Sequence, residues 1–324
     1  MLALTGASGF VGGAIRRRLA GDGTAVRLLA RADMPAGDNE TVAAVGDFTA
    51  AGCDFAGALA GVSTVVHAAA ANAAAASDDD AAFQAANVGV TARLAEAAAQ
   101  AGVRRIVLLS SIKARGERSH PERPLKADEP PEPEDAYGRS KLDAERVLRE
   151  ACERHGIEGI ALRAPLVYGP GVMGNFRLLL ALAGSGMPLP FGAIRNRRSL
   201  IHVDNLADAV VRAATAPFPG AAQPAFAVYQ VKDDADPSTP ELLRGLAAGI
   251  GRRPVLLPVP AGPMFALARA LGRAGQADRL LGSLVLDDAP FRRDFGWRPP
   301  VAQADGLAET ARWFRDLRRT GGRR

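Results

Sequence analysis

The chain has 324 residues, of which 48% are hydrophobic and 23% are charged. These proportions are typical of a globular protein of one or two domains and exclude disorder along the whole chain. The net charge is +5, but residues 311–324 hold six Arg and one Asp and therefore carry all of it. A neutral body with a basic end gives little support to a polyanionic partner, so we expect no nucleic acid to bind.

Cysteine content and hydropathy indicate a cytoplasmic protein. Cys53 and Cys152 are too few for a disulfide framework, and the first residues lack the basic segment of a secretory signal. Residues 55–77 contain no Asp, Glu, Lys or Arg. That stretch is mostly alanine, however, and is too weakly apolar for a spanning helix. We expect a buried strand and a small-residue loop there, and no membrane association.

Short apolar runs alternate with helical patterns in the first half of the chain, which predicts an α/β fold with a Rossmann-type doubly wound parallel sheet. The predicted strands are Leu2–Thr5, Ala25–Ala30, Thr41–Val45, Thr64–Ala68, Arg104–Ser110 and Gly159–Arg163. The predicted helices cover about 10–22, 79–101 and 136–155. The proline-rich residues 116–136 predict a long surface loop between them.

Gly6, Gly9 and Gly12 follow the first predicted strand and open the first predicted helix. Glycines at this spacing permit a tight turn, close approach of a pyrophosphate and close helix–strand packing. The positive end of the helix dipole then favours the anion. We therefore predict a dinucleotide site. Residues 1–165 would form the NAD(P)-binding domain, with parts of 199–231 returning to it. Residues 166–318 would form mainly a smaller, interleaved substrate-binding lobe, and 319–324 a basic tail.

The choice between NAD and NADP stays open at the end of the second strand. NAD sites usually carry Asp or Glu there, whereas this chain has Ala30 followed by Arg31. Arg31 could pair with the 2′-phosphate of NADP, stack on adenine in a site for NAD, or lie in solvent. Asp47, where the third strand should end, could accept a hydrogen bond from the adenine amino group or be an ordinary turn residue.

Tyr137 and Lys141 are one helical turn apart on the same face of a predicted helix. The chain has only three tyrosines and four lysines, so a coincidental pair is not expected. A nearby ammonium favours the phenolate and lowers the tyrosine pKa, which suits acid–base chemistry on an alcohol or a carbonyl. Ser110 and Ser111 end a predicted strand at the sheet edge where open α/β folds bind ligands.

These motifs resemble the extended short-chain dehydrogenase/reductase superfamily, in its NAD-dependent epimerase/dehydratase branch, over about residues 1–300. The run Gly192–Ser199 is similar to bacterial UDP-glucose or UDP-N-acetylglucosamine 4-epimerase-like proteins of polysaccharide clusters. The motifs that carry the resemblance are Thr5–Gly12, Val65–Ala70, Leu109–Ser111, Tyr137–Lys141, Leu162–Pro165, Tyr168–Pro170, Ile201–Asp204 and Phe295–Trp297.

The resemblance implies roles for individual residues. Tyr137 would be the acid/base, Lys141 its modulator and ribose ligand, and Ser111 the donor to the substrate oxygen. No metal is implied. The implied cofactor contacts are Gly6, Gly9, Phe10, Val11, Gly12, Arg31, Asp47, Phe48, Ala68, Ala69, Tyr137 and Lys141. The implied substrate-binding residues are Ser111, Asn87 (a helix residue that supports the site), and Asn175 and Arg198, which would grip the nucleotide-sugar pyrophosphate.

The chain departs from the family pattern at two places. Ala114-Arg115-Gly116, preceded by Lys113, replaces a frequent Val-Tyr-Gly, and Leu166 stands where many relatives carry Asn. Both departures concern recognition of the sugar rather than the chemistry.

The resemblance implies an NAD-dependent UDP-hexose 4-epimerase that acts through a transient 4-keto sugar. An alternative is an NAD(P)H-dependent reductase of a 4-keto nucleotide sugar, which Arg31 favours. A third is a non-catalytic, cofactor-sensing protein, which the retained Tyr–Lys pair disfavours. Relatives dimerise through two long helices, here about 79–101 and 136–155, so the expected assembly is a homodimer.

Overall fold

The computed structural model describes residues 1–50, 52–71, 79–219, 226–272 and 274–321. Most of the expected small-residue loop, at 72–77, lies outside these ranges, as do residues 322–324 of the expected basic tail.

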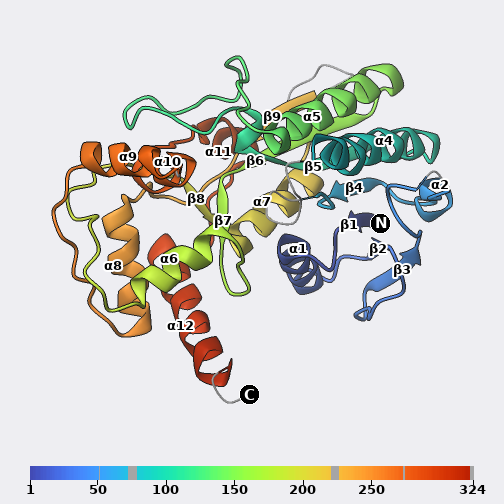
Figure 1. The fold of residues 1–324 in the computed structure, drawn as a ribbon. Coiled ribbons are helices and arrows are strands. Elements are labelled where there is room, and N and C mark those ends of the chain that lie inside the picture. Colours follow the sequence, from blue (N-terminus) through green and yellow to red (C-terminus); the bar gives the residue numbers. More distant parts are fainter. Residues whose placement is uncertain (51, 72–78, 220–225, 273, 322–324) are drawn as a thin grey trace.

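A seven-stranded parallel sheet forms the centre of the fold, in the order β3-β2-β1-β4-β5-β6-β9 (Figure 1). The six predicted strands are confirmed, each within one residue at either end. The seventh strand, β9, brings the chain back to the sheet beside β6. The strands are β1 (Leu2–Thr5), β2 (Val26–Ala30), β3 (Glu40–Ala44), β4 (Thr64–His67), β5 (Arg105–Ser111), β6 (Glu158–Ala164) and β9 (Phe226–Gln230).

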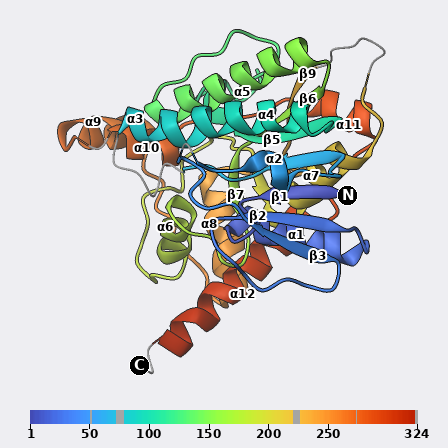
Figure 2. The ribbon, with the colours of Figure 1, turned by 90° about the vertical axis from the view of Figure 1, so that its right-hand side faces the viewer.

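Helices cover both faces of the sheet, as the doubly wound fold requires (Figures 1 and 2). One face packs α1 (Phe10–Gly21) and α7 (Val203–Thr215) into a core that includes Leu4, Val107 and Leu206. The other face packs α2 (Phe55–Ala58), α4 (Val90–Gln100) and α5 (Ala136–His155) into a core that includes Val65, Leu94 and Leu148. Buried on both faces, the strands read as continuous apolar runs.

The helix expected at about 79–101 is not uniform, and this expectation is corrected. After α3 (Asp80–Phe83) the chain forms a π-helical turn over Gln84–Gly89 and only then continues as α4. A π-helical turn re-aims the side chains that it carries. Here it holds the buried Asn87.

The helix α5 begins and ends as predicted. The Asp135 side chain caps its start by accepting a hydrogen bond from the Gly138 amide at 2.7 Å, and Gly156 ends it with a positive φ of 69°. A Cβ added at Gly138 would lie 2.5 Å from the Lys113 carbonyl oxygen. The helix therefore packs closely against the short turn η2 (Ile112–Ala114), and the proline-rich segment runs over the surface between them.

A smaller, mainly helical lobe follows β6, with its own core around Phe176 and Leu243 and a two-stranded sheet (Figure 1). The helix α11 packs its Phe291 under the large sheet instead, so the two parts interleave. Within the described residues, no helix is long and apolar enough to cross a membrane. The elements of this part are β7 (Leu166–Tyr168), α6 (Asn175–Ala183), β8 (Leu200–His202), α8 (Thr239–Ile250), α9 (Ala261–Ala270), α10 (Ala274–Leu281), α11 (Ala289–Phe295) and α12 (Gln303–Gly321).

Candidate active site

The glycine loop between β1 and α1 forms a cradle with no room for side chains. Gly6 has a φ of 74°, and a Cβ there would lie 2.7 Å from the Ala69 amide nitrogen. A Cβ at Gly12 would lie 1.9 Å from the Gly6 carbonyl oxygen. Gly9 caps the helix without a side chain, so the first amides of α1 stay accessible from this side. This cradle fits the diphosphate of a dinucleotide.

The remaining residues expected to hold the dinucleotide lie after neighbouring strands. Arg31 is exposed directly after β2. Asp47 is exposed after β3, and its Oδ1 accepts hydrogen bonds from Thr49 N and Oγ1, both at 2.9 Å. These bonds, with Arg31 nearby, hold the pKa of Asp47 below its usual range. Asp47 is thus a turn residue, while its contact with adenine stays a prediction. Four further residues that are expected to contact the cofactor are partly buried: Phe10, Val11, Phe48 and Ala68.

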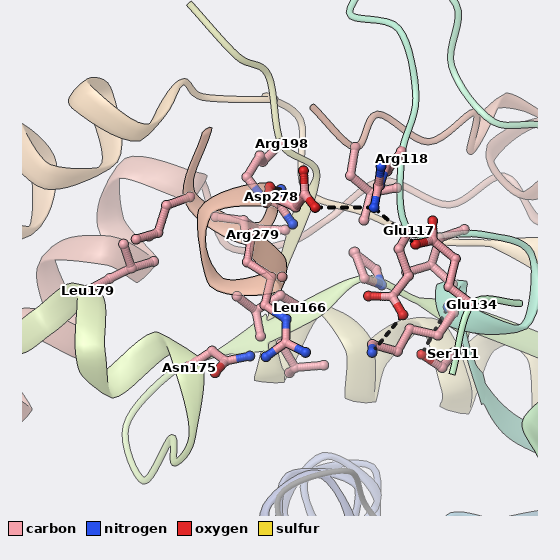
Figure 3. A pocket seen from close by; sticks show the side chains of 18 of the residues that line it. Ser111, Glu117, Arg118, Glu134, Leu166, Asn175, Leu179, Arg198, Asp278 and Arg279 are labelled. Atoms are coloured by element: carbon pink, nitrogen blue, oxygen red, sulfur yellow. Dashed lines mark hydrogen bonds and ion pairs between the residues drawn. The ribbon is translucent and has the colours of Figure 1, made fainter. Parts of the chain in front are cut away.

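A cavity of about 510 Å³ opens between the carboxyl end of β5 and the smaller lobe (Figure 3). Ser111 and Tyr137 line it from the sheet side, and Asn175 and Arg198 line it from the lobe. Four predicted site residues from four separate stretches of the chain thus share one space.

Burial dominates the electrostatics of the Tyr–Lys pair. It raises the pKa of Tyr137 to about 12, against a hydrogen bond from Ser111, and the charge of Asp135 adds to the rise. Burial also lowers the pKa of Lys141 to about 8, against the charge of Glu145. The sequence predicted that the Lys141 ammonium would lower the pKa of Tyr137. The structure corrects this direction, because loss of solvation outweighs the hydrogen bond from Ser111.

A buried ion pair lies behind Lys141. Glu145, one turn further along α5, accepts hydrogen bonds from Arg163 of β6, to Oε1 at 3.0 Å and to Oε2 at 2.7 Å. The Ser110 hydroxyl donates to the same carboxylate at 2.5 Å. Glu145 and Arg163 are each only 4% exposed at their side chains. The ion pair therefore ties β6 to the helix that carries Tyr137 and Lys141, and the Ser110 hydroxyl ties the strand that ends in Ser111 to the same carboxylate.

Asn87 does not line the cavity, and its side-chain amide forms hydrogen bonds to other residues of the protein. Its Nδ2 donates to Ser140 Oγ at 2.9 Å, and its Oδ1 accepts from Ala71 N at 2.9 Å. Ser140 in turn donates to the Tyr137 carbonyl at 2.8 Å. Asn87 thus supports the turn of α5 that presents Tyr137, and its contact with substrate stays a prediction.

The lobe end of the cavity is basic. Arg198 donates to the Gly282 carbonyl at 3.0 Å, and burial lowers its pKa to about 10. Figure 3 shows Arg279 of α10 reaching towards Asn175 below it. Arg279 was not anticipated, because α10 carries no recognisable motif.

The sheet end of the cavity is lined by ion pairs that sequence reasoning also missed. Lys113 pairs with Glu117 at 2.9 Å and with Asp135. Arg118 pairs with Glu134 at 3.3 Å and with Asp278 of α10 at 3.1 Å. Of these residues, only Lys113 was noted from the sequence, because it precedes the segment 114–116 that departs from the family pattern.

The two departures from the family pattern lie in different parts of the structure. Leu166 lines the cavity, where it offers an apolar contact instead of an amide. Arg115 points away into the proline-rich loop, where it pairs with Glu129 at 2.8 Å and donates to the Lys126 carbonyl at 3.3 Å. Arg115 thus holds the loop in place.

Comparison with known proteins identifies the family of this chain. The NAD dependent epimerase/dehydratase family matches residues 2–228. The chain belongs to this family. The members of this family are enzymes, and the chain has the doubly wound α/β fold that the sequence predicted. A UDP-glucose 4-epimerase from Vibrio cholerae is 34% identical over 315 residues, covering 96% of this chain and 94% of that protein.

Solved structures of similar proteins share the architecture. MoeE5, solved with UDP-glucose and NAD, is 25% identical with a TM-score of 0.73, covering 98% of this chain and 99% of its own. The same protein is also solved with UDP-glucuronic acid and NAD. The UDP-glucuronic acid 4-epimerase from Bacillus cereus has a TM-score of 0.76 at 19% identity, over 98% of this chain and 99% of its own, and so supports the fold alone.

Proposed function

We propose that this protein is an NAD-dependent UDP-hexose 4-epimerase, acting on a glucose/galactose pair or its N-acetylated form through a transient 4-keto sugar. The observation that carries the proposal is the shared cavity, which has Ser111 and Tyr137 at one end and Arg198 at the other. A nucleotide sugar needs both features, a proton-transfer group at its sugar and a cationic fork at its diphosphate.

The residues at the sheet end handle the proton. The Tyr137 phenolic oxygen accepts the proton of the sugar 4-hydroxyl and later returns it, and the Ser111 hydroxyl donates to the same substrate oxygen. Lys141 favours the phenolate from behind. The glycine cradle would hold NAD, which would supply the hydride acceptor and donor. Epimerisation takes up and gives back one hydride, so it would consume no cofactor.

The residues at the lobe end bind the diphosphate. Asn175 and Arg198 were expected there, and Arg279 joins them in the cavity lining. The guanidinium of Arg198 is already anchored to a backbone carbonyl. It is thus held in place for a bidentate contact with phosphate oxygens.

A purified, anaerobic enzyme tests the proposal with UDP-glucose and UDP-N-acetylglucosamine, with no added cofactor. We expect the 4-epimer to form, and Tyr137→Phe to slow its formation by about 10²-fold or more while the protein stays folded. Unchanged turnover in Tyr137→Phe would reject an enzymatic role for this pair and favour a non-catalytic protein.

The reductase remains a second candidate because Arg31 is exposed at the end of β2, where a 2′-phosphate of NADP would lie. The same incubation separates the two candidates. Consumption of NADPH with a 4-keto nucleotide sugar, without formation of any epimer, would support the reductase and reject the epimerase.

The homodimer implied by the resemblance stays a prediction. The helices α4 and α5, which would form its interface, lie side by side over one face of the sheet (Figures 1 and 2).

A further inference from the structure

The cavity has two ends of opposite electrostatic character. In Figure 3 Glu117, Glu134 and Ser111 lie on one side, and Asn175 and Arg279 lie on the other. With Asp135, the sheet end carries three carboxylates against the two cations Lys113 and Arg118. The lobe end carries the two cations Arg198 and Arg279 against one carboxylate, Asp278. A ligand that spans the cavity therefore meets cations at its phosphates and carboxylates at its other end.

Lys113 is the cation closest in the chain to Ser111, and its charge is already neutralised. Its ammonium pairs with Glu117 at 2.9 Å and with Asp135 on the other side. Its own backbone amide donates to Ser111 Oγ at 3.2 Å, which places this ion cluster beside the predicted catalytic serine. Asp135 cannot turn away freely, because it also caps α5.

We propose that the Glu117–Lys113–Asp135 cluster makes the enzyme select nucleotide sugars with an uncharged sugar and reject uronic acids. This inference rests on the proposed function, because it places the sugar at Ser111 and Tyr137. It goes further by naming the residues that disfavour a carboxylate at C6.

The selection follows from charge and hydrogen bonding. The hydroxyl groups of a neutral hexose, or the amide of an N-acetylated one, can donate to the free lone pairs of Glu117 and Asp135. A carboxylate at C6 would instead meet the negative charges of Glu117 and Asp135. The nearby ammonium of Lys113 already pairs with both of these residues. The side chains of Glu117 and Asp135 are 20% and 33% exposed, and like charges brought together at such a partly buried site disfavour the charged ligand.

Binding and turnover of UDP-glucose and UDP-glucuronic acid test this directly. For the wild-type enzyme loaded with NAD, we expect UDP-glucose to be favoured at least about tenfold in both Kd and kcat/KM, or about 1.4 kcal/mol. In Glu117→Gln, which frees one side of Lys113, we expect this preference to shrink about tenfold. Glu122→Gln, an exposed position on the same loop and outside the cavity lining, is the matched control and should keep the wild-type ratio.

The binding ratio separates this inference from the proposed function. If both sugars bind in the predicted ratio but neither is epimerised, the 4-epimerase proposal fails and the charge selection stands. Equal binding of the two sugars by the wild type would overturn the selection, even with full epimerase activity. An unchanged ratio in Glu117→Gln would overturn its assignment to this cluster, and failure of both sugars to bind would overturn both proposals.

Discussion

The buried pair of Glu145 and Arg163 allows a quantitative prediction for Glu145→Gln. The side chains are 4% exposed, and Arg163 donates to both carboxylate oxygens, at 3.0 and 2.7 Å. Removing one charge leaves a buried guanidinium without its counter-ion, which costs about 3–5 kcal/mol. For a chain of 324 residues, 1 kcal/mol shifts the Tm by about 1.5 °C, so we expect the Tm to fall by at least about 4 °C.

A second measurement on Glu145→Gln separates an electrostatic role from a purely structural one. The groups that the structure places around Lys141 are Tyr137 and Glu145 on α5 and His67 on β4, whose pKa of about 3 keeps it neutral. Glu145 raises the pKa of Lys141, so its neutralisation should lower that pKa below about 8. The ammonium is then lost at a lower pH, and the alkaline fall in kcat should move to lower pH.

Thermal unfolding and a pH–rate profile for Glu145→Gln are compared with Glu150→Gln, an exposed glutamate on the same helix. The control should keep the wild-type Tm and profile, because exposed charges contribute little. If the Tm of Glu145→Gln stays within about 2 °C of wild type, the ion pair does not stabilise the fold as argued. If the Tm falls but the pH profile stays fixed, Glu145 does not act on Lys141.

Two further predictions concern Lys141, for which we propose a catalytic role, and the glycine cradle proposed to hold the cofactor. Lys141→Met should lower turnover and move its pH optimum upward, because the phenolate loses its cation, and an unchanged pH profile measured by initial rates would contradict this. Gly12→Ala should abolish the thermal stabilisation produced by added NAD, because its Cβ would lie 1.9 Å from the Gly6 carbonyl, whereas Gly13→Ala, with only Arg17 Nη1 at 3.9 Å, should keep it. Equal shifts in the two variants would contradict the cradle.

The sheet could be predicted because parallel strands that are buried on both faces appear in the sequence as continuous apolar runs. Ile106–Leu109 is such a run, without alternating polar residues, and glycines mark turns between such runs. The start of α5 was equally clear, since a proline-rich segment cannot continue as helix and Asp135 is a good cap. The π-helical turn at Asn87 was missed because no local pattern marks it, and the partners of the Asn87 amide, Ala71 and Ser140, are 16 and 53 residues away in the sequence.

The charged lining of the cavity could not be predicted for a similar reason. Arg118 and Asp278 are 160 residues apart, and neither belongs to a motif. In a chain with this many arginines, charge alone does not distinguish a lining residue such as Arg279 from a solvated one. Only the return of α10 towards the proline-rich loop places these side chains at one cavity.

The pKa of Tyr137 determines when in the proposed reaction this residue can accept a proton. Bringing a phenol from a pKa of about 12 to neutrality requires about 7 kcal/mol, at 1.36 kcal/mol per unit. This value already contains the effect of the hydrogen bond from Ser111 and of the other neighbouring groups, so the free enzyme keeps this proton. The additional stabilisation has to come from a bound ligand. The positive charge of oxidised nicotinamide, at about 4 Å and an effective dielectric of about 20, would supply about 4 kcal/mol of it. In the proposed mechanism, proton transfer is then confined to the complex that holds both cofactor and sugar, so Tyr137 would become a base only when the 4-hydroxyl is present.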